Sequence, residues 1–441
     1  MDRLTQELFE LLSIPSISSG GGDAKDMQKA AEWLKARIES SKGTAEIVKG
    51  DYYPMVAGQI SASRSGAPTV LIYGHYDVQS ADPIEAWDSP PFEPTVRNDR
   101  IYARGASDDK GNFYPLLFVA CEMAEKGELP VNVRILVEGE EESLGDSAVN
   151  WVKADEQGAD CAIVFDSDMV DESTPALTIG SRGIVAVNVA VRVAERDLHS
   201  GLYGGSVPNA MHVLTSILTS VLPGPEGRLA DELRFGRVEP TEAEVITWGK
   251  LPAGEQVIKE IDARLLHPTS GDNYYRQNWT EPSIDVNGIA GGDAVQHRTI
   301  VPAAANAKLT MRLAPGQTTE QVIPVLTGRL RDAAPEGVDV EVKVTTSAEP
   351  SLFDPDSVPL KLAAKAIELA SGTAPALVRS GGTIPVLAAL AARGIQTVVS
   401  GFALAEDYIH APNESFRVES LRLGAETSRQ LYLAFAELGR G

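Results

Sequence analysis

TVLIYGHYDV, at residues 69–78, is the stretch on which the expected fold depends, because an apolar run passes directly into polar residues. VNVRILVEGE at 131–140 and CAIVF at 161–165 follow the same pattern and are also predicted strands. Between such runs lie segments with helical periodicity, which are expected to begin near Asp26, Lys110 and Asp146. The alternation predicts an α/β fold with a mostly parallel sheet flanked by helices.

The pattern changes from about Gly183 onward. GIVAVNVAVRV, SIDVNGIAG and AKLTMRLAP alternate in the manner of antiparallel strands with one solvated face, and PNAMHVLTSILTSVL is typical of an amphipathic helix. Helix and strand alternation returns after Pro315 with VPLKLAAKAIELASG and IQTVVS. We therefore predict an α/β domain in two parts, residues 1–183 and 315–441, interrupted by a smaller α+β domain at residues 184–314.

Composition narrows the class of protein. A chain of 441 residues with 43% hydrophobic and 23% charged residues is expected to be globular and to form two domains. The net charge of −23 would repel nucleic-acid phosphates and anionic lipids, so neither nucleic acid nor membrane is an expected partner. An acidic surplus fits either a solvated surface or carboxylates gathered around bound cations. The first residues lack the apolar core of a secretory signal, and we expect a cytoplasmic protein.

Polar clusters follow the predicted strands, at the ends where α/β sheets assemble their binding sites. The candidate side chains are imidazoles and carboxylates, which suit zinc, manganese or cobalt. Two dications would be balanced by Asp108, Glu142, Asp166 and a hydroxide, and a neutral centre can be buried. The clusters are GHYDV with His75 and Asp77, GASDDKG with Asp108 and Asp109, EGEEES with Glu138 to Glu142, FDSD with Asp166 and Asp168, and EDYIHAPNE with His410.

Each cluster also has a purely structural interpretation. His75 could be a core histidine, although strand alternation places Asp77 on its side, where a carboxylate could fix the imidazole tautomer. Asp108 and Asp109 could cap the helix that follows them. Glu138 to Glu142 could form a solvated acidic turn, but adjacent like charges repel unless cations offset them.

The segments GHYDVQ, ARGASDDKG, EGEEES and DLHSGLYGGSVPNA resemble those of the dinuclear metallopeptidase family. This family includes carnosinase-like dipeptidases, acetylornithine deacetylase, succinyl-diaminopimelate desuccinylase and glutamate carboxypeptidases. The resemblance spans nearly the whole chain. NWTEPSIDVNGIAGG and RSGGTIP are most similar to the carnosinase-like dipeptidase branch.

The resemblance implies a role for each member of the polar clusters. His75, Asp108 and Asp166 would hold one metal ion, and Asp108, Glu142 and His410 the other, with Asp108 as the bridge. Glu141 would be the general base, Asp77 would orient the histidine, and the Asp108–Asp109 peptide is often cis in such enzymes. Because Glu140 adds a third glutamate, base and ligand could be displaced by one residue. The register adopted here places Ser143 directly after the ligand.

The resemblance also makes the inserted domain a lid that forms the contact of a homodimer. His199 would reach the active site of the partner, and Arg312 would grip the carboxylate of the substrate, as suits a guanidinium. Thr299, Gly382 and Thr383 would complete the substrate pocket. The plainer alternatives are a surface salt bridge for Arg312 and a helix or turn contact for His199.

The function predicted from the resemblance is hydrolysis of the amide bond of dipeptides. Water activated by two divalent ions, zinc or manganese with cobalt as a further option, would attack the carbonyl while Glu141 takes the proton. An N-acyl amino acid deacylase, of the deacetylase or desuccinylase type, would use the same chemistry. A catalytically silent binding or scaffold protein that keeps the fold is the alternative from another class.

Overall fold

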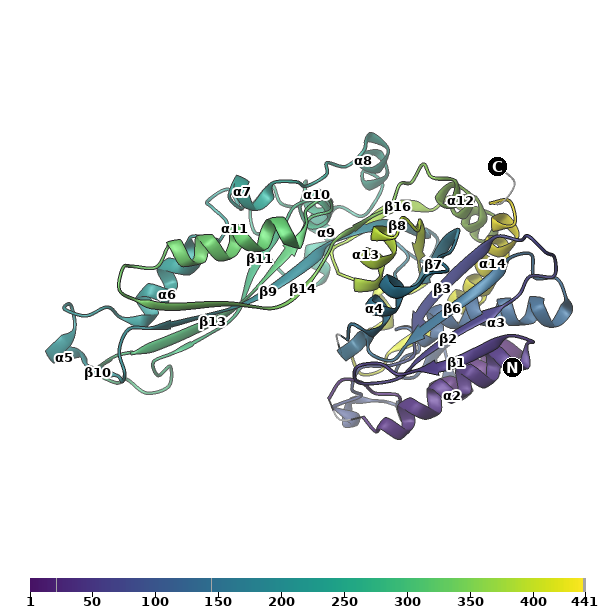
Figure 1. Ribbon diagram of the computed structural model, residues 1–441, viewed down its shortest axis with the longest axis horizontal. Coiled ribbons are helices and arrows are strands. Elements are labelled where there is room, and N and C mark those ends of the chain that lie inside the picture. The colour runs from purple at the N-terminus through teal and green to yellow at the C-terminus, as the bar shows by residue number, and fades with distance from the viewer. Residues whose placement is uncertain (21, 144, 439–441) are drawn as a thin grey trace. The chain divides into compact units, whose positions relative to one another are not determined.

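The computed structural model describes residues 1–20, 22–143 and 145–438. The chain divides into two compact units (Figure 1). The first unit comprises Met1–Ile179, Phe353–Val378 and Ala389–Gly441. The second comprises Gly180–Leu352 and Arg379–Ala388. None of the helices in the described ranges is long and apolar enough to cross a membrane.

The first unit is built on a sheet whose central strands are parallel. The strand order is β1-β2-β6-β3-β7-β17-β8-β15, with β16 paired to β8. Strands β6, β3, β7 and β17 are parallel neighbours, whereas β1, β2, β8 and β15 pair in the antiparallel sense. The bounds are β1 Thr44–Val48, β2 Met55–Ile60, β3 Thr69–His75, β6 Asn132–Glu138, β7 Cys161–Phe165, β8 Ala176–Ser181, β15 Ser351–Leu352, β16 Ala376–Ser380 and β17 Thr397–Ser400.

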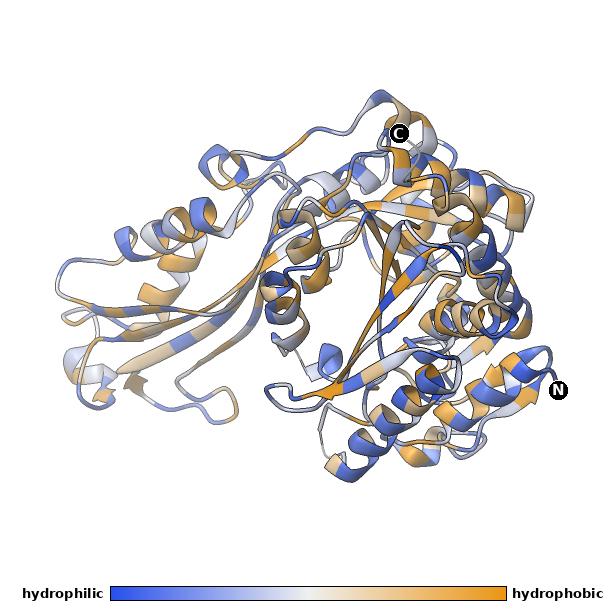
Figure 2. Ribbon diagram, turned by 45° about the vertical axis from the view of Figure 1, so that its right-hand side comes forward, coloured by the Kyte–Doolittle hydropathy of each residue, from blue (hydrophilic) through white to orange (hydrophobic). Residues whose placement is uncertain are grey.

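Helices pack against this sheet because their apolar residues recur on one side. In Figure 2 hydrophobic and hydrophilic residues alternate along these helices. Helix α3 is the exception, since nearly every residue from Lys110 to Ala124 is buried. The bounds are α1 Arg3–Leu12, α2 Ala24–Ser40, α3 Lys110–Lys126, α4 Ser147–Ala154, α12 Val358–Ser371 and α14 Val418–Phe435. Helix α13 (Pro385–Ala392) begins in the second unit and ends in the first. A small sheet of β4 (Thr95–Arg97), β5 (Arg100–Tyr102) and β18 (Ser415–Arg417) lies in the order β18-β5-β4.

The second unit contains an antiparallel sheet in the order β11-β13-β9-β14. Burial alternates along β9 and β13, so one face is buried and the other is solvated. Helices α6 and α11 cover the buried face and share its apolar core. The bounds are β9 Gly183–Arg192, β11 Ser283–Gly291, β13 Ala304–Leu313, β14 Asp339–Ala348, α6 Ala210–Thr219 and α11 Thr319–Asp332.

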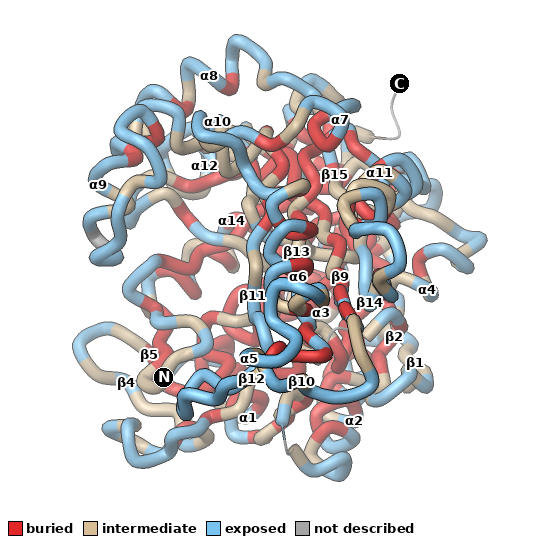
Figure 3. The backbone as a smooth tube through the Cα atoms, turned by 90° about the vertical axis from the view of Figure 1, so that its left-hand side faces the viewer, coloured by how far each residue is buried: buried red, intermediate tan, exposed pale blue. Residues whose placement is uncertain are grey.

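Short elements complete the second unit. Strands β10 (Leu198–His199) and β12 (Ile300–Val301) pair next to the short helix α5 (Ser200–Tyr203). Helices α8 and α9 are mostly exposed (Figure 3). The remaining bounds are α7 Asp231–Arg234, α8 Glu242–Trp248, α9 Gly254–Glu260 and α10 Tyr274–Thr280.

The predicted fold class is confirmed: a mainly parallel central sheet occurs with a separate, smaller antiparallel sheet. The second unit continues beyond the boundary that the sequence suggests after Ala314. It does so because β14 pairs along the whole of β9, and because α11 contributes Val322, Leu326 and Leu330 to the apolar core. The short segment Arg379–Ala388 also belongs to this unit.

Candidate metal centre

Parallel strands bring the predicted ligands to one edge of the first unit's sheet. Strand β3 ends at His75, which lies in register with Glu138 at the end of β6. Strand β7, the other neighbour of β3, ends immediately before Asp166. The segment before α3 carries Asp108, and His410 follows β17 and the 3-10 turn η3 (Ala405–Asp407). Side chains from distant parts of the sequence therefore lie together at the carboxyl ends of the strands.

Two groups of three side chains could each hold a metal ion. His75, Asp108 and Asp166 form one group, and Asp108, Glu142 and His410 form the other. Within each group the potential ligand atoms lie within 4.8 Å of one another. Asp108 Oδ1 is 3.0 Å from His75 Nε2, and its Oδ2 is 2.9 Å from His410 Nε2. The carboxylate thus presents one oxygen to each group, as a bridge would require.

The electrostatics of this cluster fit bound cations. Burial, together with the negative charges of Asp108 and Glu142, raises the pKa of Asp166 to about 7, although the positive charge of His75 opposes the rise. Burial and the same kind of repulsion raise the pKa of Glu141 well above its usual value. Carboxylates gathered this closely repel one another unless cations compensate them. Imidazole and carboxylate donors at these spacings suit zinc or manganese, so the residues present fit two divalent ions.

Asp77 ties the histidine to the glutamate turn. His75 Nδ1 lies 3.0 Å from the Asp77 backbone oxygen and 3.4 Å from its Oδ1. The buried Asp77 carboxylate also accepts hydrogen bonds from Ser18 Oγ at 2.5 Å and from the Glu142 amide at 3.0 Å. A third hydrogen bond, from the Glu141 amide, measures 3.3 Å. One carboxylate therefore holds both the imidazole and the turn η2 (Glu141–Ser143).

The geometry separates the three consecutive glutamates. Glu140 is fully buried and accepts the amides of Tyr52 and Tyr53 at 2.6 and 2.7 Å, so it has a structural partner. Glu142 Oε1 lies 3.1 Å from His410 Nε2. Burial, with the negative charges of Asp166, Glu142 and Asp108, raises the pKa of Glu141, although His75 opposes the rise, so the Glu141 carboxyl lies near the acidic cluster. This arrangement favours the register in which Ser143 follows the ligand.

The structure does not support the alternative in which the side chains of Asp108 and Asp109 cap helix α3. Asp109 stands at the N-cap of α3 but makes no capping hydrogen bond. Its Oδ2 instead accepts the His75 amide at 3.1 Å, and the Asp108–Asp109 peptide is cis. The acidic turn is not simply solvated either, because Glu138 is buried and bonded to the Tyr73 hydroxyl.

Several residues at the centre were missed by the sequence analysis. Gln79 donates to Glu142 Oε2 at 2.7 Å and is itself held by Ser19 Oγ at 2.7 Å. Glu414 and Asp407 bond the segment that carries Asp108. Gln79 lies within the quoted GHYDVQ motif, and its period-two spacing from Asp77 could have identified it. Glu414 and Asp407 lie within the quoted EDYIHAPNE segment, but the sequence pattern does not indicate that they are buried.

The predicted substrate residues belong to the second unit and form two separate groups. Arg312 Nη1 donates to Thr383 Oγ1 at 2.9 Å, and the adjacent Gly382 amide donates to Ser380 Oγ at 3.0 Å. His199 and Thr299 are exposed neighbours at β10 and β12, where the Ser200 amide donates to the Thr299 oxygen. The two groups lie at opposite ends of strand β13, which is ten residues long. At ~3.3 Å per residue, this strand separates Arg312 from the group of His199 and Thr299 by about 30 Å. The structure does not bring them together within one chain.

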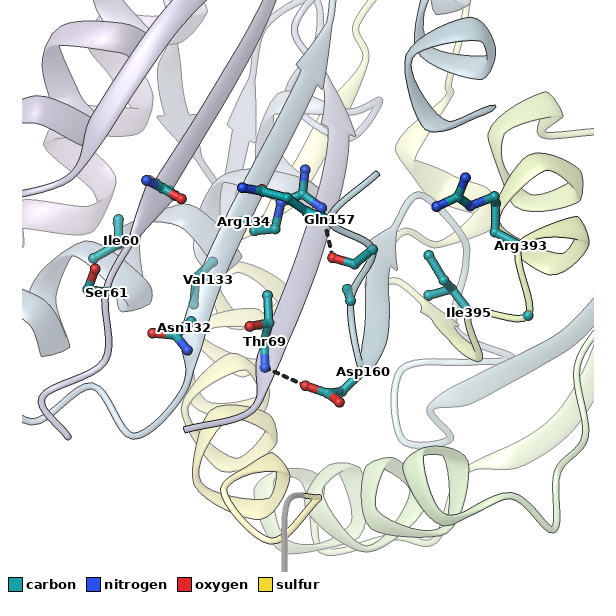
Figure 4. A pocket seen from close by; sticks show the side chains of 14 residues that line it. Ile60, Ser61, Thr69, Asn132, Val133, Arg134, Gln157, Asp160, Arg393 and Ile395 are labelled. Carbon is teal, nitrogen blue, oxygen red and sulfur yellow. Dashed lines mark hydrogen bonds between the residues drawn. The ribbon is translucent and has the colours of Figure 1, made fainter. Parts of the chain in front are cut away.

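A cavity of about 620 Å³ opens at the opposite ends of the same strands. Thr69, Asn132, Arg134 and Asp160 are among its lining residues (Figure 4). Arg134 is paired with Asp155 at 2.7 and 2.8 Å, and Asp160 Oδ2 accepts the Thr69 amide at 2.7 Å. These polar groups are satisfied by protein partners. The candidate chemistry therefore lies at the carboxyl ends of the strands and not in this cavity.

Comparison with known proteins identifies the class as a peptidase. The model of peptidase family M20/M25/M40 matches residues 71–434, and the chain belongs to this family. The chain is 28% identical over 407 residues to the cysteinylglycine-S-conjugate dipeptidase of Corynebacterium striatum, covering 88% of this chain and 85% of that one. It is 27% identical over 460 residues to the human Beta-Ala-His dipeptidase, covering 99% and 86%.

Solved structures show the same fold. The M20 family metallo-carboxypeptidase Sso-CP2 from Sulfolobus solfataricus has a TM-score of 0.87 and 28% identity, with coverage of 99% of this chain and 100% of that one. Human carnosine dipeptidase 1 has a TM-score of 0.79 and 24% identity, with coverage of 99% and 96%. The predicted family is confirmed, and the chain is a member of a family of metallopeptidases.

Proposed function

We propose that the protein hydrolyses the amide bond of dipeptides at a centre of two divalent metal ions, zinc or manganese with cobalt as a further option. The observation that carries the proposal is the pair of ligand groups that share Asp108, with Glu141 beside them. The names of the relatives supply the substrate class, since dipeptidases from Corynebacterium striatum and Homo sapiens align with most of the chain.

Two bound ions would supply polarisation of the substrate carbonyl and a lowered pKa for a water molecule. Glu141 takes the proton of the attacking water and passes it to the leaving amine, because it lies beside the ligands without being needed as one. Asp77 holds His75 in the tautomer and orientation that expose Nε2. Gln79 fixes one oxygen of Glu142 and leaves the other facing His410.

The second unit would serve substrate binding and dimer formation. Among the residues that the structure describes, the Arg312 side chain donates its hydrogen bond to the neutral Thr383 hydroxyl, so its charge suits the carboxylate of a short substrate. Thr383 and Gly382 lie on the adjoining segment and would line the same pocket. The separation of His199 and Thr299 from Arg312 supports a homodimer in which each chain lends these two residues to its partner.

A second candidate is carboxypeptidase action on longer peptides. It is favoured by the similarity to the Sulfolobus metallo-carboxypeptidase at 28% identity over 99% of this chain. Both activities require a free carboxylate, and they differ in the length of chain that precedes the cleaved bond. N-acyl amino acids, the substrates of the deacylase alternative, lack the free amine of a dipeptide.

A substrate panel with metal analysis tests the proposal. Purified protein is assayed for metal content and for hydrolysis of Ala-Ala, Ala-Ala-Ala, longer alanine peptides and N-acetyl-alanine. We expect hydrolysis of the dipeptide first, and loss of about 10²–10⁴-fold in kcat for Glu141→Ala with metal retained. Glu368→Ala, on the exposed side of α12, is the matched control. Preference for longer or acylated substrates, or full activity of Glu141→Ala, would contradict the proposal.

Subunit mixing tests the role of His199. His199→Ala and Glu141→Ala are each purified and then mixed under conditions that exchange subunits. If His199 acts in the site of the partner, a mixed dimer has one site with both wild-type residues, and activity returns. No recovery in a mixture that light scattering shows to contain exchanged dimers would place His199 in the site of its own chain or outside catalysis.

A further inference from the structure

The segment that presents His410 has an unusual backbone. Tyr408, His410 and Asn413 have φ values of 55°, 62° and 63°, and none of them is glycine. The left-handed conformation costs such residues roughly 1–2 kcal/mol each. It persists only where surrounding contacts hold it in place. The contacts at the two ends of residues 407–414 therefore decide where the imidazole of His410 stands.

Glu414 fastens the C-terminal end of this segment. Its side chain is fully buried, and its two oxygens accept the amides of Gly105, Ser107 and Asp108 at 2.9, 2.9 and 3.0 Å. Arg104 Nη1 donates a fourth hydrogen bond at 2.8 Å, and this ion pair is buried on both sides. A buried carboxylate with four donors is held firmly, because removal of any one partner leaves a charge or amide unsatisfied.

Asp407 fastens the N-terminal end. Its Oδ2 accepts Ser107 Oγ at 3.0 Å and the Leu404 amide at 2.9 Å. Its Oδ1 is paired with Arg100, which also donates to Ser415 Oγ at 2.9 Å. Asp407 is 1% exposed, so this end of the segment is also anchored from within the protein.

Both anchors reach the same loop. Within residues 104–108, three backbone amides and the Arg104 guanidinium donate hydrogen bonds to Glu414. The Ser107 hydroxyl in the same loop donates to Asp407. That loop ends in Asp108, whose Oδ2 faces His410 Nε2 at 2.9 Å. His75 and Asp166, in contrast, stand at the ends of β3 and β7 and are placed by the sheet.

We propose that Asp407 and Glu414 are positioning residues that fix His410 against Asp108, and so set the affinity of the ion held by Asp108, Glu142 and His410. The proposal rests on the two-ion centre proposed above. We call the contacts of Asp407 and Glu414 with Arg100 and residues 104–108 the clamp. The group formed by His75, Asp108 and Asp166 depends less on the clamp, because His75 and Asp166 are placed by the ends of strands. Loss of the clamp lowers the affinity for one ion much more than for the other.

Cobalt titration of the full-length protein tests the clamp. Metal-free wild type, Glu414→Gln and Asp407→Asn are titrated with Co²⁺ against a competing chelator, and visible absorption follows each step. His410→Ala identifies the step that depends on the imidazole. We expect the clamp variants to weaken that step by about 10- to 100-fold, the usual effect of residues that orient ligands, and the other step by less than about threefold. Their cobalt spectra should change in the same direction as that of His410→Ala.

Two further variants separate positioning from stability. Glu7→Gln removes a carboxylate that anchors Arg37 elsewhere in the same unit, and is the matched control for a general loss of stability. Ser107→Ala removes a single hydrogen bond to Asp407 and is the mild variant, should Glu414→Gln fail to fold. We expect it to weaken the same step by a smaller factor.

The outcomes distinguish the clamp from the function on which it rests. Two ions bound with wild-type affinity by Glu414→Gln and Asp407→Asn would overturn the clamp and leave the dipeptidase proposal standing. Weakening equal to that of Glu7→Gln, or confined to the step that His410→Ala leaves intact, would also overturn it. Failure of the wild type to bind two ions would overturn both proposals.

Discussion

The two sheets of the molecule place candidate functional residues in different ways. In the first unit, the parallel strands are buried on both faces, and the five predicted ligands stand at their carboxyl edge, where His75 is buried and His410 is half exposed. In the second unit, the antiparallel sheet is buried on one face, and His199 and Thr299 are exposed at one end. The side chains proposed to share ions lie together within one unit, whereas His199 and Thr299, proposed for substrate recognition, lie at the surface.

The difference indicates how much each site can be disturbed. A change among the ligands leaves buried charges without partners, and the surrounding residues have little room to adapt. A change at an exposed recognition residue removes one contact and leaves the fold intact. Substitutions in the two units should therefore differ in the size of their effects.

Asp108→Asn should have the largest effect on activity. The residue faces both histidines, so the change removes a charge from both ligand groups at once. We expect a loss of hydrolysis beyond the ~10²–10⁴-fold attributed to a general base, together with loss of metal. Steady-state kinetics and metal analysis measure it. Retention of both ions by a folded Asp108→Asn protein would show that the two groups do not depend on a shared carboxylate.

Core substitutions should separate the two sheets. In β3, consecutive residues Leu71 and Ile72 are both buried, and replacing either by alanine should lower the free energy of unfolding by about 2–5 kcal/mol. In β13, Leu309→Ala should cost a similar amount, but its exposed neighbour Lys308→Ala should change stability by less than about 0.5 kcal/mol. Urea unfolding measures all four. Equal costs for Lys308 and Leu309 would contradict the one-sided sheet.

Arg312→Met should affect substrates selectively. A charge-assisted hydrogen bond contributes about 1.5–3 kcal/mol, which corresponds to a loss of about 10- to 150-fold in kcat/KM for dipeptides. Methionine keeps much of the side-chain bulk without the charge. Dipeptide amides, which lack the carboxylate, serve as control substrates and should lose much less. An equal loss for acids and amides would assign Arg312 to structure and not to carboxylate recognition.

Glu125→Gln should have the smallest effect, confined to acid. Hydrogen bonds from Arg3 lower the pKa of Glu125 to about 2, so its ionised form is favoured in the folded protein. The stabilisation is complete above the ordinary carboxyl pKa near 4.5 and is lost as pH falls toward 2. For this exposed pair we expect less than about 1 kcal/mol. Unfolding measured from pH 6 to pH 2 should show a shallower acid decline in the variant.

Residues near the polar strand ends were the most predictable part of the molecule. CAIVF forms β7 over the predicted residues, α3 begins at Lys110 as expected, and Asp146 precedes α4. Local pattern suffices there, because a buried strand or helix start is defined by its own residues. The polar clusters that follow the predicted strands also indicated where the five ligand candidates lie, although their roles as ligands stay a prediction.

Other features depend on contacts that sequence pattern does not record. Strand β14 joins the second unit by pairing with β9, although its own alternation would suit either sheet. Helices α7 to α10 are four to seven residues long, which is too short to show a clear helical period in the sequence. Glu414 and Asp407 are ordinary acidic residues in the sequence, and only the fold shows that both are buried against the loop before Asp108.

The order of the ligands along the chain has a consequence for biosynthesis. His75, Asp108 and Asp166 leave the ribosome early, and more than half of the chain is still to be made before His410 and Glu414 appear. On the proposed assignment, the residues of one ligand group are therefore all synthesised while the other group still lacks its imidazole. The second ion site is completed later in translation than the first.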